Sequence, residues 1–138
     1  EYSYGNVGTG SEAYLSQDFS PLTLELMQYL NTVLRTSFNV CFLNKYDDEK
    51  CHLGWHADDF AGMKADEPIA VVSFGAEREI WVKLKSQTGV IPAEQKIKLH
   101  DGSLFVMPAG YQEFFLHRIP KHDRSCEWRI SLTFRSFN

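Results

Sequence analysis

The chain has 138 residues, 43% of them hydrophobic and 23% charged, which is typical of one globular domain with a well-formed core. A net charge of −4 argues against strong nonspecific binding to duplex nucleic acid by this segment alone, although a locally basic groove is compatible with it. No apolar run approaches the roughly 20 residues of a membrane span, and the first residues carry no secretory pattern. We therefore expect neither a membrane anchor nor secretion.

The three cysteines, Cys41, Cys51 and Cys126, are odd in number and show no Cys-x-x-Cys or zinc-ribbon spacing. A disulfide scaffold is not expected, and a reducing compartment fits best: the cytoplasm, or the nucleus in a eukaryote. Because residue 1 is Glu rather than Met, we expect that the chain has been trimmed or processed.

Residues 1–20 mix Gly, Ser, Tyr and Asn without a period, which predicts a loop or short hairpin. Ser20-Pro21 then supplies an N-cap and a proline at the first helical position. Apolar residues recur at helical spacing to about residue 36: Leu22, Leu26, Leu30, Val33 and Leu34. This is the one helix that the sequence predicts.

The remaining pattern is that of short strands separated by turn signals such as Asp47-Asp48, Gly75 and Asp101-Gly102. The eight expected strands are Phe38–Leu43, His52–His56, Pro68–Phe74, Glu79–Leu84, Gln95–Leu99, Ser103–Met107, Gln112–His117 and Trp128–Phe134. Regularly spaced strands after a single helix predict a mainly β fold: a sandwich, a jelly roll or a small barrel. We expect one domain over residues 1–138.

One candidate metal site begins in the segment Gly54–Asp59. At a strand end, positions i and i+2 face the same way, so His56 and Asp58 can hold one ion from one side. His117, at the end of a later strand, is the natural third ligand. Two histidines and a carboxylate form the facial triad of non-haem Fe(II) oxygenases. The alternatives are a strand-end His56 bonded to its carboxylate neighbour and a His117 satisfied within the core.

The other histidines are weaker candidates for metal ligands. His52 shares the face of His56 but lies one step further from Asp58, so polar packing is expected. His100 sits at an Asp-Gly turn, and His122 lies in a charged loop. Cys51 beside His52 suggests zinc, but the further ligands at zinc spacing are absent.

The last predicted strand carries two arginines on one face. Its apolar row is Ile130, Leu132 and Phe134, and its polar row is Arg129, Ser131, Thr133 and Arg135. Two inward guanidiniums need an anion between them, because a buried unpaired charge is very costly. Their Cα atoms lie about 20 Å apart in a strand, which leaves about 7 Å between the side-chain tips, the span of a small dicarboxylate. The alternative is a solvent-facing polar stripe.

Several separated motifs, in order, resemble the AlkB family of Fe(II)/2-oxoglutarate-dependent dioxygenases across nearly the whole chain. They are Tyr4-Gly5, Phe38–Tyr46 ending in Asn-x-Tyr, Gly54–Asp59, Pro68–Glu79, Gly102–Met107, His117 and the final Arg-x-x-x-Thr-Phe-Arg. The resemblance implies a double-stranded β-helix, a jelly-roll variant, which agrees with the strand count.

The resemblance also implies site residues. The iron ligands and catalytic residues would be His56, Asp58 and His117. The 2-oxoglutarate contacts would be Asn44, Tyr46, Arg129, Ser131, Thr133 and Arg135. Arg129 would hold the C5 carboxylate and Arg135 would lie near the C1 end. For Asn44 and Tyr46, the alternative is polarity at the entry to the turn Asp47-Asp48.

Two positions depart from the family pattern. Ser131 stands where Asn is common, and its hydroxyl is shorter and lacks an amide donor. Phe60 stands where family repair enzymes commonly carry an acidic residue near the substrate base. Asp59 could take that role, or Phe60 could stack on a base. Tyr4, with Tyr2 and Tyr14, falls where the family builds its nucleotide-recognition lid, of which residues 1–20 would form part; the alternative is ordinary loop packing.

The activity implied is oxidative demethylation of N-alkylated bases such as 1-methyladenine or 3-methylcytosine, as in DNA repair. It would consume O₂ and 2-oxoglutarate, release succinate, CO₂ and formaldehyde, and take methylated DNA or RNA as substrate. A base within a duplex would have to be extruded. We expect a monomer. Two alternatives are an oxygenase acting on a protein, lipid or small molecule, and a non-catalytic binding module.

Overall fold

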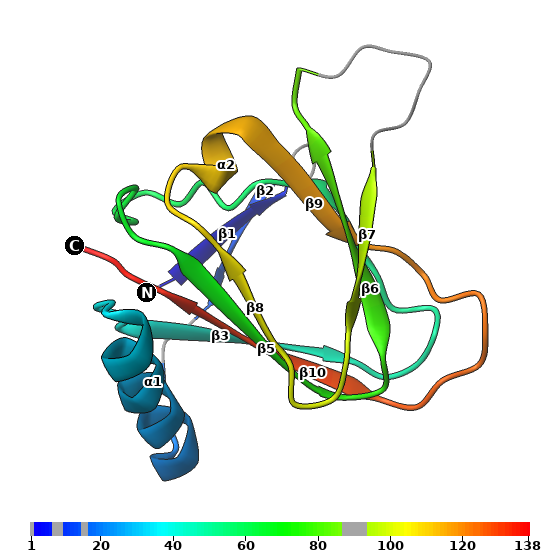
Figure 1. The fold of residues 1–138 in the computed structure, drawn as a ribbon, viewed down its shortest axis with the longest axis horizontal. Coiled ribbons are helices and arrows are strands. Elements are labelled where there is room, and N and C mark those ends of the chain that lie inside the picture. The colour runs from blue at the N-terminus through cyan, green and yellow to red at the C-terminus, as the bar shows by residue number, and fades with distance from the viewer. Residues whose placement is uncertain (1, 7–9, 15–16, 87–93) are drawn as a thin grey trace.

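The computed structural model describes residues 2–6, 10–14, 17–86 and 94–138, with side chains described from residue 17 onward (Figure 1). The elements in order are β1 Tyr2–Asn6, β2 Gly10–Tyr14, α1 Pro21–Leu34, β3 Val40–Tyr46, β4 Leu53–His56, β5 Ile69–Gly75, β6 Arg78–Leu84, β7 Gln95–Leu99, β8 Leu104–Met107, α2 Tyr111–Phe114, β9 Phe115–Ile119 and β10 Arg129–Arg135. Neither helix has the length and apolar character that a membrane crossing requires.

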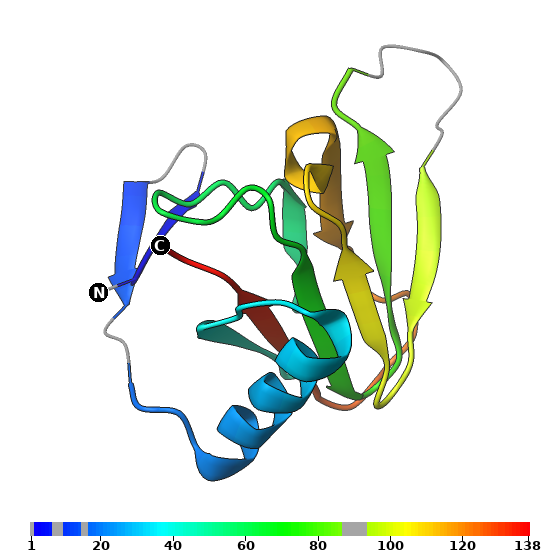
Figure 2. The ribbon, with the colours of Figure 1, turned by 60° about the vertical axis from the view of Figure 1, so that its left-hand side comes forward.

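Two four-stranded antiparallel sheets form the body of the fold. Their strand orders are β3-β10-β5-β8 and β4-β9-β6-β7, and every neighbour in each sheet is antiparallel. Figures 1 and 2 show the two sheets as two layers that face one another. This arrangement confirms the predicted jelly roll. Strands β1 and β2 pair with each other, so the hairpin expected within residues 1–20 is also confirmed.

Helix α1 begins and ends as its sequence predicts. The Ser20 hydroxyl accepts a hydrogen bond from the Thr23 N–H at 3.2 Å, and Pro21 occupies the first turn. Arg35, in the left-handed conformation, ends the helix. Met27 and Leu30 pack on a cluster formed by Phe38, Ala70, Val72, Leu132 and Phe134. The helix therefore covers one face of the β3-β10-β5-β8 sheet, as Figure 2 shows.

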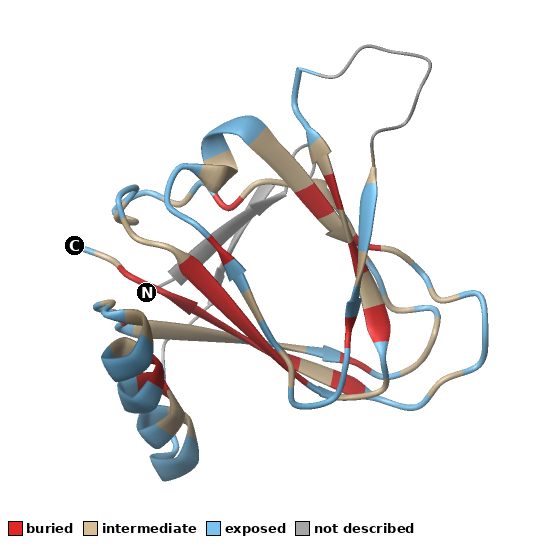
Figure 3. Ribbon diagram, viewed as in Figure 1, coloured by how far each residue is buried: buried red, intermediate tan, exposed pale blue. Residues whose placement is uncertain are grey.

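Strand β10 alternates between that core and the space between the sheets. Leu132 and Phe134 join the cluster beneath α1, whereas the polar row lines a cavity on the other face. All seven residues except Ile130 are buried, and β10 is red for most of its length in Figure 3. The solvent-facing polar stripe is therefore wrong: Arg129 and Arg135 are 1% and 4% exposed.

The predicted strand Gln112–His117 is wrong in its first half. Residues Tyr111–Phe114 form a single helical turn, and the strand runs from Phe115 to Ile119. Gly110 takes a left-handed conformation with φ of 82°, and the Phe115 N–H closes the turn on the Tyr111 carbonyl. The strand predicted from Phe38 is likewise displaced, because β3 continues through Tyr46 and places Asn44 and Tyr46 inside the sheet.

Candidate active site

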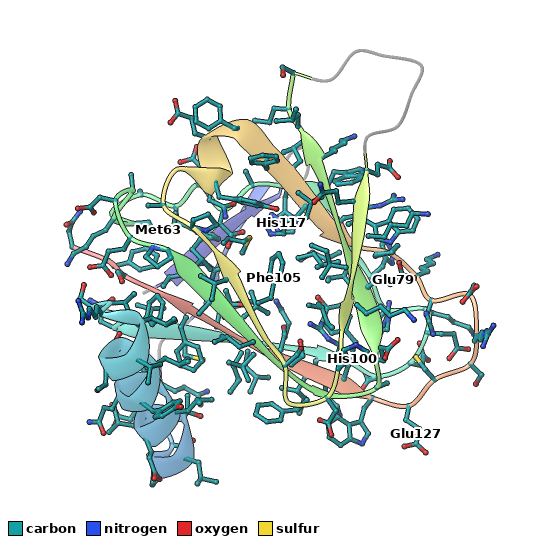
Figure 4. All side chains as sticks on the ribbon, viewed as in Figure 1. Met63, Glu79, His100, Phe105, His117 and Glu127 are labelled. Carbon is teal, nitrogen blue, oxygen red and sulfur yellow. The ribbon has the colours of Figure 1, made fainter. Side chains whose placement is uncertain are left out.

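Three side chains that could hold a metal ion meet between the sheets. His56 ends β4 and pairs directly with His117 on β9, and Asp58 follows two residues after β4. One ligand atom from each residue lies within 4.8 Å of the others, and the two imidazole centroids are 4.2 Å apart. Figure 4 shows His117 directed into the space between the sheets. Within the described ranges this is the one such group.

Asp58 uses its two carboxylate oxygens differently. Oδ2 accepts hydrogen bonds from Arg135 Nη2 at 2.6 Å and Nε at 3.0 Å. Oδ1 lies 3.5 Å from His56 Nε2 and 3.7 Å from His117 Nε2, and it accepts no hydrogen bond from the part of the chain described. Burial raises the pKa of this carboxyl, but the charge of Arg135 outweighs burial and holds the pKa well below its usual range.

Both imidazoles direct Nε2 toward Oδ1 of Asp58. His56 Nδ1 lies 2.7 Å from the Gly54 carbonyl oxygen, which only accepts, so Nδ1 carries the proton and a neutral ring has its lone pair on Nε2. Burial, followed by the nearby His56, lowers the pKa of His117 to about 4, which keeps its ring neutral at pH 7. Two imidazoles and a buried carboxylate oxygen without a hydrogen-bond partner among the described residues are a donor set that fits Fe(II).

Gln112, on α2, links the Asp58 loop to β8. Its side-chain Oε1 accepts the Asp58 N–H at 2.8 Å, and its Nε2 lies 3.3 Å from Met107 Sδ. The sequence offered no signal for this contact, because Gln112 is 54 residues from Asp58 and was placed on a strand.

Arg129 is the second charged feature of the cavity. Its Nη2 donates to Ser73 Oγ at 2.9 Å, and its guanidinium lies 5.0 Å from the Tyr46 ring centroid. Its Nε and Nη1 are buried without a hydrogen-bond partner among the residues described, and no described carboxylate forms an ion pair with it. A buried guanidinium without an anion is costly, so the cavity is suited to an anionic ligand.

Polar groups from three adjacent strands surround Arg129. In the sheet register Asn44, Ser131 and Ser73 lie side by side, and Tyr46 lies beside Arg129. The cavity is lined by Asn44, Tyr46, Leu53, His56, Asp58, Val71, Ile80, Leu99, Met107, His117, Ile119, Arg129, Ser131, Thr133 and Arg135. The structure thus brings together all nine predicted metal and cosubstrate residues. Ser73 was overlooked, although a buried serine on a strand beside the arginine row was a usable signal.

Arg78 is a further buried cation with a structural role. Its Nη2 donates to the carbonyls of Cys51 at 2.7 Å and Pro120 at 2.6 Å. Its guanidinium lies 5.5 Å from the Tyr46 ring, which therefore has Arg78 and Arg129 as neighbours. Burial raises the pKa of Tyr46, and the Arg129 charge opposes that rise in part. Arg78 thereby links the segments before β4 and after β9.

The predicted substrate residues lie less closely together. Asp59 is exposed, and Phe60 is half-buried, with its ring 4.9 Å from the Arg135 guanidinium and 6.5 Å from the Phe137 ring. The side chain of Tyr4 lies outside the described part of the structure. His52 is exposed beside the Lys50 carbonyl, and His100 bonds Glu77, so neither lines the cavity.

Comparison with known proteins agrees with this geometry. Residues 3–135 match the 2OG-Fe(II) oxygenase superfamily. The chain is 35% identical over 89% of its length to the DNA oxidative demethylase ALKBH2 of Arabidopsis thaliana and 30% identical over 92% to human ALKBH2. It is 32% identical over 88% of its length to the human alpha-ketoglutarate-dependent dioxygenase alkB homolog 3.

These matches cover 45%, 54% and 48% of the three relatives, so the chain spans about half the length of the curated relatives it matches. The chain belongs to the 2OG-Fe(II) oxygenase superfamily and, within it, to the AlkB family. The resemblance stated from the sequence motifs is confirmed.

Proposed function

We propose that this chain is an Fe(II)- and 2-oxoglutarate-dependent dioxygenase that demethylates N-alkylated bases such as 1-methyladenine and 3-methylcytosine in DNA or RNA. One observation carries the proposal. The donor atoms of His56, Asp58 and His117 converge in the same cavity as the uncompensated guanidinium of Arg129. Its similarity to two proteins named DNA oxidative demethylase supports the substrate class.

Iron would be held by His56 Nε2, Asp58 Oδ1 and His117 Nε2. When bound, iron and 2-oxoglutarate supply the chemistry that uses O₂ to hydroxylate an N-methyl group, which then leaves as formaldehyde. Arg135 keeps Asp58 ionised by bonding its other oxygen, so Oδ1 remains available. The Gly54 carbonyl fixes the orientation of the His56 ring.

Arg129 would hold the C5 carboxylate of 2-oxoglutarate, with Ser73 orienting its guanidinium. Ser131, Thr133 and Asn44 supply further polar groups on the cavity wall, and Arg135 sits toward the metal end. The apolar part of the wall, which includes Ile80, Leu99 and Ile119, limits water around the bound cosubstrate.

The substrate base would approach from the side of the Asp58 loop. Asp59 is exposed there and offers a carboxylate, and the half-buried Phe60 offers an aromatic ring next to Arg135. Tyr4, in the β1–β2 hairpin, would belong to the lid above the base. A base held in a duplex would have to leave the stack before it reached the cavity.

The test is formaldehyde release from single-stranded oligonucleotides that carry 1-methyladenine or 3-methylcytosine, with Fe(II), 2-oxoglutarate and ascorbate. We expect turnover by the wild type and by the matched control His52→Ala, and none by Asp58→Ala. Intact 2-oxoglutarate binding without release of formaldehyde from any methylated base would contradict the proposal. Turnover of 2-oxoglutarate stimulated by a protein, lipid or metabolite, but not by oligonucleotides, would favour the alternative oxygenase.

A further inference from the structure

Cations and indoles alternate on the outer face of the β4-β9-β6-β7 sheet. Lys83 Nζ lies 4.3 Å from the Trp55 ring centroid, and the Arg118 guanidinium lies 4.9 Å from the same ring. Arg118 also lies 4.3 Å from the Trp81 ring, and Lys96 Nζ lies 4.2 Å from it. We call these five residues the cation–indole row.

The row lies on the opposite face of the sheet from the cavity. Along β6 and β9, Ile80, His117 and Ile119 line the cavity, so the intervening Trp81 and Arg118 face outward. Lys96, Trp81 and Arg118 are direct cross-strand partners, and Trp55 continues the row on β4 next to His56. At about 4.8 Å between strands, the row crosses about 14 Å.

The charge of the row is not neutralised. Lys45, Lys64 and Lys98 each form an ion pair with a carboxylate. Lys83, Lys96 and Arg118 form none with any described residue. A neutral indole attracts a cation without cancelling its charge, so three positive charges are held together on a chain of net charge −4. Glu79, which stands two residues before Trp81 on β6, accepts the Trp81 indole N–H at 3.1 Å.

Arg118 is the best organised of the three cations. Its guanidinium contacts two indole rings, and its Nε is buried without a hydrogen-bond partner in the described part of the chain. A guanidinium held in this way loses little conformational freedom when its remaining N–H groups bind an anion, and its planar fork matches a phosphate.

We propose that the cation–indole row binds the phosphodiester backbone of a nucleic-acid strand outside the cavity. The inference rests on the proposed function only for the identity of the polyanion. A repeating anion fits three cations spread over about 10 Å, on β7, β6 and β9, better than a single small anion does. Trp55 precedes His56 in β4, which is an edge strand, so the row begins directly behind the metal-ligand cluster. A strand that leaves the cavity past this edge would meet the row.

The test measures binding of an unmodified, fluorescent single-stranded oligonucleotide without metal or 2-oxoglutarate, as a function of salt. The variant is Lys83→Gln/Lys96→Gln/Arg118→Gln, and the control of equal charge is Lys45→Gln/Lys50→Gln/Lys121→Gln. For the row variant, the slope of log K for oligonucleotide binding against log salt should be smaller than that of the wild type by about 2, because three phosphate contacts contribute about 0.7 each. The control variant should reduce the slope by less than half as much. The single exposed change Lys96→Glu should weaken binding without affecting folding.

Equal slopes for the wild type and the row variant would overturn the inference, even if methylated bases are demethylated. Loss of oligonucleotide binding in the row variant would support it even if no base is demethylated. An acidic peptide, tested as oligoglutamate of matched charge, should bind at least tenfold more weakly than the oligonucleotide. Equal or tighter binding of that peptide would contradict the choice of a nucleic-acid partner.

Discussion

Arg135 donates two hydrogen bonds, from Nη2 and Nε, to Oδ2 of Asp58, while Oδ1 faces the two histidines. The two residues are 77 positions apart in sequence, and both are at least nine-tenths buried. This bond links the C-terminal strand to the loop after β4. Arg135 thus acts on the candidate metal site through Asp58. Arg129, at the other end of β10, has no such carboxylate among the described residues and can bind a different anion.

Arg135→Gln should destabilise the metal-free protein by about 3–5 kcal/mol at pH 7, because it leaves Asp58 as a buried carboxylate without a cation. In the wild type, the pKa of Asp58 is lower in the folded protein than in the unfolded chain, where it is about 4. The ionised Asp58 therefore stabilises the folded protein above about pH 4, and this stabilisation is lost as pH falls through the folded pKa. In the variant, burial raises that pKa, so the penalty should shrink toward pH 4. Urea unfolding with EDTA at pH 7 and pH 4 measures both effects, and Arg124→Gln, on an exposed loop, is the control.

His56→Ala should abolish Mn(II) binding at pH 7, measured by calorimetry, because one of the two imidazole donors is lost. His52→Ala, four residues earlier and outside the cavity, should bind Mn(II) as the wild type does. Equal affinity in both variants would show that the metal lies elsewhere.

The metal-free protein should lose stability as pH falls below 6.5, because unfolded His117 binds a proton at about pH 6.5 and the buried folded ring does so only at about pH 4. In that window the unfolded state holds more protons, so stability rises with pH. Between pH 7 and pH 5, His117 alone should lower the free energy of unfolding by about 2 kcal/mol. Urea unfolding of His117→Gln should show a correspondingly shallower pH dependence, and His100→Gln should show the wild-type dependence.

The alternation of side chains in strands was enough to predict much of the site. It placed Arg129 and Arg135 on one face of β10, because the alternation of side chains along a strand does not depend on which segments lie beside it. The family resemblance, and not the predicted strand, which ended at Leu43, supplied Asn44 and Tyr46. The helix from Pro21 was equally readable, since Ser20 and Pro21 act locally.

Contacts between distant segments could not be read in this way. The pairing of Arg135 with Asp58 depends on how β10 passes the loop after β4, and the hydrogen bond from Asp58 to Gln112 depends on a helical turn set by Gly110. Apolar neighbours such as Phe114 and Phe115 fit a strand equally well, so the local pattern predicted the wrong structure for Gln112. Phe60 was considered as a stacking partner for a base, and its contact with Arg135 had no local signal.

Gly75→Ala should be more destabilising than Gly102→Ala, although both glycines have left-handed backbones, with φ of 92° and 74°. A Cβ at Gly102 meets nothing within 4 Å, so its cost is the conformational term of about 1–2 kcal/mol. A Cβ at Gly75 lies 2.4 Å from the Trp128 carbonyl oxygen, which adds about 1–3 kcal/mol of overpacking. Urea unfolding compares the two, and equal losses would contradict the predicted clash.

Arg129→Gln should weaken 2-oxoglutarate binding by about 2–5 kcal/mol, which is about 30-fold or more, because the cosubstrate loses the cation for its far carboxylate. Calorimetric titration with Mn(II) in place of iron measures this, and Arg118→Gln, on the outer face, should bind 2-oxoglutarate normally. Unlike Arg135→Gln, Arg129→Gln should leave the metal-free protein at least as stable as the wild type. No described carboxylate pairs with Arg129, so the substitution leaves no buried anion without a cation. Wild-type affinity for 2-oxoglutarate in Arg129→Gln would place the far carboxylate on another residue. A large loss of stability would show that Arg129 is structural and not reserved for a ligand.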